Sequence, residues 1–161
     1  MSPEEFTDAL SRFSTGVTVV SARDDRDDVA TVVTSFSSVS LRPPLVMVSI
    51  GSDAYLSEIL ERREVWAVSV LGAHQKQLAG RLSAPGRPSP RLLLDGVPHH
   101  RGQHSDALII EGGLTALECR TSQRVTAGDH TLVIGEVVSV AYVSYNRTPL
   151  LRYAHAYRAI A

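Results

Sequence analysis

The segment Val17–Val33 reads VTVVSARDDRDDVATVV and decides the fold class of the chain. It contains two β-branched runs, Val17–Val20 and Val29–Val33, with the charged segment Asp24–Asp28 between them. β-Branched residues favour strands, and a short polar cluster between two such runs is typical of a turn. The segment therefore predicts two strands joined by a charged turn.

Further strand patterns follow along the chain. Apolar and β-branched residues recur over Leu45–Ile50, Trp66–Leu71, Leu108–Ile110, Leu114–Arg120 and Thr131–Val143. Together with the first two runs they predict about seven strands, enough to close or nearly close a sheet. These strands do not alternate regularly with helices, as a doubly wound fold requires. We expect a mainly β fold, one small β-barrel with a few peripheral helices.

Three helices are expected around this barrel. Ser2, Pro3 and Glu5 form a capping box with proline at the first helical position. The helix that they begin has an apolar face that includes Phe13, and we expect Gly16 to end it. Two more helices are predicted where apolar residues recur at helical spacing, over Tyr55–Arg63 and Ala73–Leu82.

The composition limits the classes of protein that the chain can belong to. With 161 residues and 43% apolar residues, we expect a single domain over residues 1–161 with a real core. The net charge of −1 excludes a nucleic-acid binder that relies on bulk charge. The apolar runs are too short for a membrane span, and the N-terminus lacks a signal-type stretch. We expect a protein of the cytoplasm.

Several residues with reactive side chains carry only weak signals. Cys119 is the one cysteine, which excludes an internal disulfide, and its strand pattern predicts a buried, inert thiol. His99, His100 and His104 fall in a Pro-rich segment over Ser83–His104 that predicts a long loop. We interpret them as solvated histidines and expect no metal site, since no cysteine accompanies them.

Two other segments could hold a ligand. Thr34–Ser40 presents hydroxyls and backbone amides that can bind the carbonyls of a heterocycle or a phosphate. The alternative is a Ser-rich, bulged strand. The turn Gly128-Asp129 places His130 at the start of a long strand, at the barrel rim, where it could reach a ligand. The alternative is that Asp129 and His130 only cap the turn.

The order of several segments resembles that of a known family. The segments are Phe13–Val20, Thr34–Leu41 with Pro43-Pro44-Leu45, Val68–Leu71, Leu117–Cys119, Gly128–His130 and Pro149–Leu151. This set, from about Phe6 to Tyr157, is similar to the flavin reductase-like family. The resemblance implies an FMN-binding split barrel and an NAD(P)H:flavin oxidoreductase, the component that supplies reduced FMN or FAD to a partner monooxygenase.

The resemblance also implies a set of binding residues. Val33, Thr34 and Ser35 would line the isoalloxazine edge of the flavin, and His130 matches a histidine near the nicotinamide of NADH or NADPH. The residues that would flank the ribityl chain and the phosphate are Ser40, Ser49, Ile50, Gly51 and Ser52.

This chain departs from the family pattern at three places that touch flavin. Ala30-Thr31-Val32 replaces Gly-x-Thr, and Ala54-Tyr55-Leu56 replaces Ser-x-Thr in the phosphate loop. Pro90-Arg91-Leu92 keeps the cation of the third motif but loses its aromatic residue. We expect Arg91 to meet the flavin phosphate, with Arg87 as the competing candidate, because a guanidinium binds phosphate with two hydrogen bonds.

The sequence thus predicts a flavin reductase whose hydride transfer is a property of its two cofactors, with no ionising catalytic residue. The alternative is a non-reductase split barrel that binds flavin or another planar ligand in a biosynthetic pathway. We also expect a homodimer, because the apolar segment Pro149–Tyr153 requires a covering surface.

Overall fold

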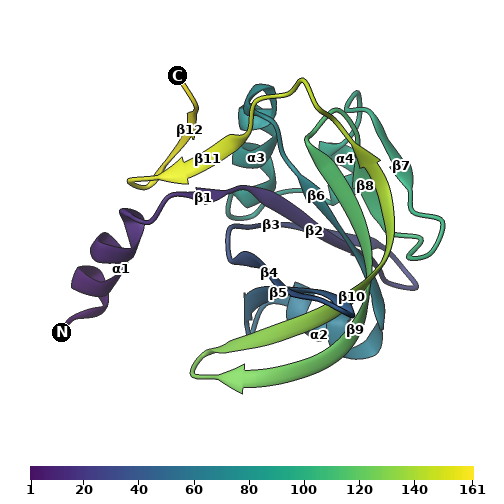
Figure 1. The fold of residues 1–161 in the computed structure, drawn as a ribbon, viewed down its shortest axis with the longest axis horizontal. Helices are drawn as coiled ribbons and strands as arrows, with labels where there is room; N and C mark the ends of the chain where they lie inside the picture. The colour runs from purple at the N-terminus through teal and green to yellow at the C-terminus, as the bar shows by residue number, and fades with distance from the viewer.

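A computed structural model describes residues 1–161 and is built around an antiparallel sheet of seven strands (Figure 1). Their order across the sheet is β3-β2-β6-β9-β10-β5-β4. The strands are β2 (Thr18–Arg23), β3 (Asp28–Val33), β4 (Phe36–Leu41), β5 (Pro44–Gly51), β6 (Val65–Val70), β9 (Thr115–Ala127) and β10 (His130–Val143).

The two edges of this sheet are consecutive in the chain. Strand β3 ends at Val33 and β4 begins at Phe36, although β3 and β4 lie at opposite ends of the strand order. Three peptide steps span at most about 11 Å, so the sheet must curl until its edges are close. Thr34 and Ser35 therefore cross the split of a nearly closed barrel.

Two smaller sheets flank the barrel. Strands β1 (Thr15–Gly16), β11 (Leu150–Tyr153) and β12 (Ala156–Ala159) form one sheet with β11 in the middle. Strands β7 (His99–Arg101) and β8 (Leu108–Ile110) form the other. The first of these sheets brings the C-terminus next to the N-terminal segment.

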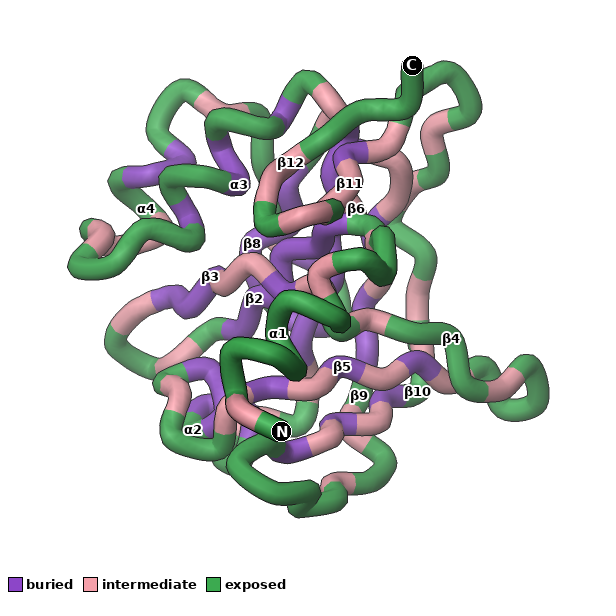
Figure 2. The backbone as a smooth tube through the Cα atoms, turned by 90° about the vertical axis from the view of Figure 1, so that its left-hand side faces the viewer, coloured by how far each residue is buried: buried purple, intermediate pink, exposed green.

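The helices lie around the sheets. They are α1 (Pro3–Ser11), α2 (Tyr55–Arg62), the 3₁₀ turn η1 (Ala73–Gln75), α3 (Lys76–Ser83) and α4 (Pro90–Leu93). Helix α1 has the predicted capping box, in which the Glu5 amide donates to Ser2 Oγ at 3.1 Å. It projects from the body of the molecule and has no buried residue (Figures 1 and 2).

The core fills the barrel and extends under the helices. One cluster joins the sheet to α2 through Ile59 and Trp66, and a second joins it to α3 and α4 through Leu82 and Leu93. Gly135 on β10 is required by this packing, because a Cβ there would lie 2.5 Å from Cζ2 of the buried Trp66 ring. The sheet is thus closely packed against the Trp66 ring at this position.

The structure confirms the mainly β barrel with peripheral helices. The hairpin predicted over Val17–Val33 is β2 and β3, and its charged turn is closed by the Asp24 amide, which donates to the Asp27 carbonyl at 2.8 Å. His130 is the first residue of β10, as expected.

Four details of the prediction are wrong. Helix α1 ends at Ser11, because Gly16 pairs with β11 and already belongs to a strand. The main sheet contains the hydroxyl-rich β4 and excludes β8, which pairs with β7. The segment Ser83–His104 contains α4 and β7. The chain also continues beyond β10 into two further strands, whose short hairpin carries no glycine or asparagine to mark its turn.

Candidate functional site

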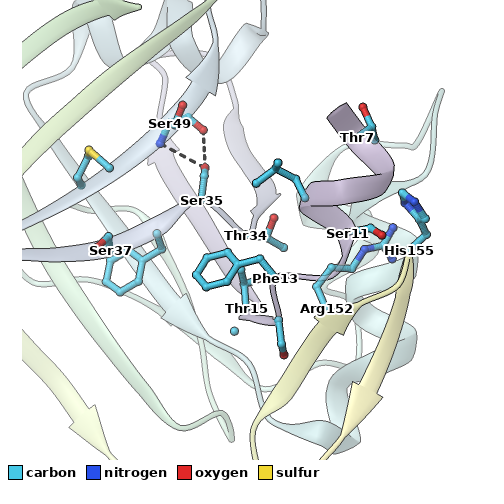
Figure 3. A pocket seen from close by; sticks show the side chains of 15 residues that line it. Thr7, Ser11, Phe13, Thr15, Thr34, Ser35, Ser37, Ser49, Arg152 and His155 are labelled. Atoms are coloured by element: carbon cyan, nitrogen blue, oxygen red, sulfur yellow. Dashed lines mark hydrogen bonds between the residues drawn. The ribbon is translucent and has the colours of Figure 1, made fainter. Parts of the chain in front are cut away.

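The largest cleft of the protein, about 640 Å³, opens at the split of the barrel (Figure 3). Thr34, Ser35 and Ser49 form its wall on the barrel side, and α1 and β11 form the opposite wall. The remaining lining residues include Thr7, Leu10, Ser11, Phe13, Ser14, Thr15, Phe36, Met47, Arg152 and His155.

Hydrogen bonds between Ser35 and Ser49 order the barrel wall. The Ser35 hydroxyl donates to the Ser49 carbonyl at 2.6 Å and accepts from the Ser49 amide at 3.3 Å (Figure 3). The ladder between β4 and β5 shifts register between Ser38 and Ser40. The Ser/Thr run is therefore a bulged strand, and its first residues are also a wall of the cleft.

The lining of the cleft suits a planar heterocycle. Leu10, Phe13, Phe36 and Met47 supply apolar surface. The hydroxyls of Ser14, Thr15 and Thr34 form no hydrogen bond with the protein, which leaves them free to bind a ligand. Small-molecule sites combine an apolar lining with a few polar groups of this kind. A flavin or nicotinamide ring with its carbonyl and amide groups fits this donor set.

The other predicted binding residues, on β3, β4 and the end of β5, only partly share this cleft. The side chains of Val33 and Ile50 are buried in the core, so these two residues offer the ligand only their backbone. The Ser52 hydroxyl lies 2.9 Å from the Thr131 hydroxyl. Ser40 pairs with Leu45 near the opposite end of the β4–β5 hairpin, away from the other candidates.

His130 lies next to this end of β5. It pairs with Gly51, so its side chain is on the same face of the sheet as those of Ser49 and Met47, because side chains alternate along a strand. Its Nδ1 lies 2.7 Å from Oδ1 of Asp129, and this hydrogen bond lowers the pKa of the Asp129 carboxyl. The imidazole is half-exposed and is not among the lining residues. The geometry agrees with both the binding and the capping interpretations.

A second cavity, of about 310 Å³, lies beside the start of β3. Tyr55 and Arg87 line it, and Arg87 Nη2 lies 3.4 Å from the Thr31 hydroxyl. Arg87 forms no ion pair, whereas Arg91 donates from Nε to Oδ2 of Asp28 at 2.8 Å and does not line the cavity. The geometry therefore favours Arg87 over Arg91 as a free cation.

Asp28 anchors the segment that carries both arginines. Its carboxylate is buried, and Arg101 donates to its two oxygens at 2.7 and 2.9 Å. Burial alone would raise the pKa of Asp28, but the hydrogen bonds from Arg101 and Arg91 outweigh it and hold the pKa below the usual value. Sequence reasoning missed this residue, because it looks like the last charge of an exposed turn.

Other residues considered from sequence lie apart from the cleft. Cys119 is buried, and burial raises its pKa to about 12, so the thiol is inert as predicted. His99 and His100 are exposed on β7, where His100 Nδ1 lies 2.8 Å from a Glu111 carboxylate oxygen. None of the helices has the length and apolar character needed to cross a membrane.

Sequence reasoning also missed one side of the cleft. Arg152 and His155 come from the C-terminal hairpin, and Ser14 and Thr15 from the segment that was expected to be helical. Sequence reasoning interprets the apolar segment Pro149–Tyr153 only as a surface that needs covering. The available signal for this wall was the short apolar pattern Leu150–Tyr153, which only Arg152 interrupts.

Comparisons with known proteins agree with this geometry. Residues 10–161 match the flavin reductase like domain. The chain is 32% identical over 157 residues to the reductase component of 4-hydroxyphenylacetate 3-monooxygenase from Thermus thermophilus, covering 98% of this chain and 96% of that protein.

Two solved structures have the same fold. The flavin reductase component of a bacterial two-component tryptophan halogenase superimposes with a TM-score of 0.92 at 30% identity, over 99% of this chain and 98% of the other. The NADH:FAD oxidoreductase of Streptomyces globisporus, solved with NAD and FAD fragments, gives a TM-score of 0.91 at 31% identity, over 100% of this chain and 96% of the other. With a split barrel, a ring-sized cleft at the split and a family match over nearly its whole length, this chain belongs to the flavin reductase-like family.

Proposed function

We propose that this chain is an NADH-dependent flavin reductase, a single flavin reductase-like domain over residues 1–161 that supplies reduced FMN or FAD to a partner monooxygenase. The observation that carries the proposal is the cleft at the barrel split, which combines apolar rings with unpaired hydroxyls. The relatives named above support the nicotinamide, the flavin and the type of partner.

In this proposal the protein aligns the nicotinamide with the flavin. When both are bound, the reduced nicotinamide and the flavin supply the chemistry themselves, as hydride transfer from C4 of one to N5 of the other. Thr34 and Ser35 would hold the edge of a bound ring, and the apolar Phe13 and Phe36 in the same lining would help to exclude water. Positioning of this kind needs no ionising catalytic residue.

The resemblance to the family supports further binding residues, some of them outside the cleft. We assign Val33, Thr34 and Ser35 to the isoalloxazine edge. The residues assigned to the ribityl chain and phosphate are Ser40, Ser49, Ile50, Gly51 and Ser52. We also place the protein in the cytoplasm, where the lone thiol of Cys119 stays reduced.

A nicotinamide oxidation assay tests the function. Purified protein is mixed with NADH, and absorbance of the reduced nicotinamide is followed before and after addition of FMN or FAD. Flavin-stimulated oxidation above the protein-free rate is expected. Flavin binding without any oxidation would instead support a carrier of flavin, an alternative raised by the loss of hydroxyls at Ala54 and Leu56.

We expect His130→Ala to raise the KM for NADH several-fold and to change kcat less. The reason is that His130 shares a sheet face with Ser49, and hydride transfer does not require the imidazole to release a proton. Steady-state kinetics and a thermal melt of the same variant provide the measurement. An unchanged KM with a lower Tm would show that His130 only caps its turn with Asp129.

We propose that the protein is a homodimer. Helix α1 has no buried residue, and Phe6 on the helix and Phe13 just after it are 52% and 72% exposed. An uncovered face of this kind in one chain is typical of an interface. Light scattering should give twice the chain mass of 17.4 kDa. Phe6→Asp, outside the cleft, should shift the mass toward one chain, and a monomeric wild type at micromolar concentration contradicts the proposal.

A further inference from the structure

Arg152 is an unpaired guanidinium in the wall of the large cleft. It lies on β11, the middle strand of its sheet, opposite Thr15 on one side and Tyr157 on the other. Its Cζ lies 4.9 Å from the centre of the Tyr157 ring, which holds the planar group by a cation–π contact. Arg152 is half-buried, and its guanidinium forms no ion pair or hydrogen bond with another side chain. A positioned but unpaired cation of this kind is prepared for an anion.

The turn after Arg152 is held in an unfavourable backbone conformation. Ala154 and His155 have φ of 49° and 59°, in the left-handed region that residues with a Cβ seldom adopt. The Ala154 amide donates to the Ser11 carbonyl at 2.8 Å, which fastens the turn to the end of α1. Positive φ at both central residues is the geometry that a two-residue hairpin loop favours, so this turn fixes the hairpin that carries Arg152.

The other ionisable groups at this end of the cleft leave Arg152 free. His155 Nε2 lies 3.9 Å from Oδ1 of Asp8, so the nearby carboxylate faces the imidazole. In Figure 3, Arg152 and His155 come from the same hairpin and border the cleft beside Ser11. Thr34 and Ser35 lie across the same cleft. A ligand with its ring at Thr34 and an anionic group farther along would span these two walls.

We propose that Arg152 binds a phosphate group of the nicotinamide dinucleotide, an inference that rests on the proposed function. A guanidinium offers two parallel N–H donors that match two phosphate oxygens. The unpaired hydroxyls of Ser14 and Thr15 line the same wall and can complete the hydrogen bonding. Arg152 is thus a binding residue, and it sets the direction in which the dinucleotide extends from its nicotinamide ring.

The test compares Arg152→Ala with Arg158→Ala at saturating flavin. Arg158 is an exposed cation of the same hairpin that does not line the cleft, so it controls for net charge. Loss of a charged hydrogen bond should raise the KM for NADH about 10- to 100-fold in Arg152→Ala. The kcat and the KM for flavin should stay within about 3-fold, because the interaction removed is uniform binding. Arg158→Ala should match the wild type.

Three nicotinamides distinguish which phosphate is bound. If Arg152 contacts the phosphate next to the nicotinamide ribose, the KM for reduced nicotinamide mononucleotide rises as that for NADH does. If it contacts the phosphate on the adenosine side, only the KM values for NADH and NADPH rise, and a rise for NADPH alone contradicts the effect expected on NADH. An unchanged KM for all three, or an equal rise in the KM for flavin, overturns the inference.

A conservative variant separates binding from folding. Arg152→Lys keeps a charge but loses the two-pronged geometry, so it should recover part of the affinity even if Arg152→Ala unfolds the hairpin. A Lys variant that melts as the wild type does and has the same KM contradicts the role of the guanidinium. If the wild type itself oxidises no NADH with flavin, the proposed function fails. An active wild type with unaffected arginine variants overturns this inference alone.

Discussion

Arg87→Ala is expected to raise the Kd for FMN about 10- to 100-fold, the cost of one charged hydrogen bond to phosphate. Arg87 lines the cavity beside β3 and forms no ion pair, so its guanidinium is free to bind an anion. Compared with the family pattern, the phosphate loop lacks two hydroxyls, at Ala54 and Leu56. Arg87 should therefore contribute a larger share of the affinity for FMN. The measurement is a titration with FMN and, in parallel, with riboflavin, which carries no phosphate.

Riboflavin and Arg91→Ala are the controls for this result. The Kd for riboflavin should not change in Arg87→Ala, because only the phosphate contact is lost. Arg91 donates to Asp28, so Arg91→Ala should lower stability and leave the Kd for FMN within about 3-fold. The opposite pattern, with FMN binding lost only in Arg91→Ala, would restore Arg91 as the phosphate ligand that the family pattern implies.

Asp28→Asn is expected to lower the free energy of unfolding by about 3 kcal/mol, because it leaves two arginines facing a neutral buried group. Arg101 and Arg91 both donate to this carboxylate, and through them Asp28 ties the β2–β3 hairpin to α4 and β7. The Tm should fall by about 10 °C at fixed protein concentration. Asp25→Asn, which removes an exposed ion pair with Arg63 from the same turn, should have little effect.

The effect of Asp28→Asn should depend on pH in one direction. The folded-state pKa of Asp28 is lowered, so its stabilising contribution is present above the unfolded value of about 3.9 and is lost as pH falls through the folded value. Urea unfolding of both proteins should therefore give a constant difference from about pH 7 to pH 5 and a shrinking one below about pH 4. A difference that grows on acidification contradicts this assignment.

Local patterns made the barrel predictable. The runs Val17–Val20 and Val29–Val33 are strongly β-branched and separated by a short turn, so the first hairpin follows from neighbouring residues alone. The outer half of β9, Thr121–Ala127, is polar on both faces and was missed for that reason. It is a strand because β10 pairs along its whole length.

The site was predicted on one wall only. Thr34 and Ser35 were identified because their residue types and family pattern coincide at the barrel split. Arg152 was missed because it lies on a hairpin that the sequence does not mark. This hairpin turns at Ala154 and His155, and neither is a residue that usually adopts the left-handed conformation. Asp28 and Arg101 are far apart in sequence, and only the fold shows that they form an ion pair.

Helix α1 is a wall of the cleft with little packing against the rest of the protein. It has nine residues, none of them buried, and a helix of this length is unstable in water without packing. Thr7, Leu10 and Ser11 nevertheless line the cleft. A ligand seated against them adds packing that the helix otherwise lacks, so ligand binding and the order of α1 are coupled. Any contact that orders α1 beforehand, including a second copy of the chain, therefore tightens ligand binding without touching the ligand.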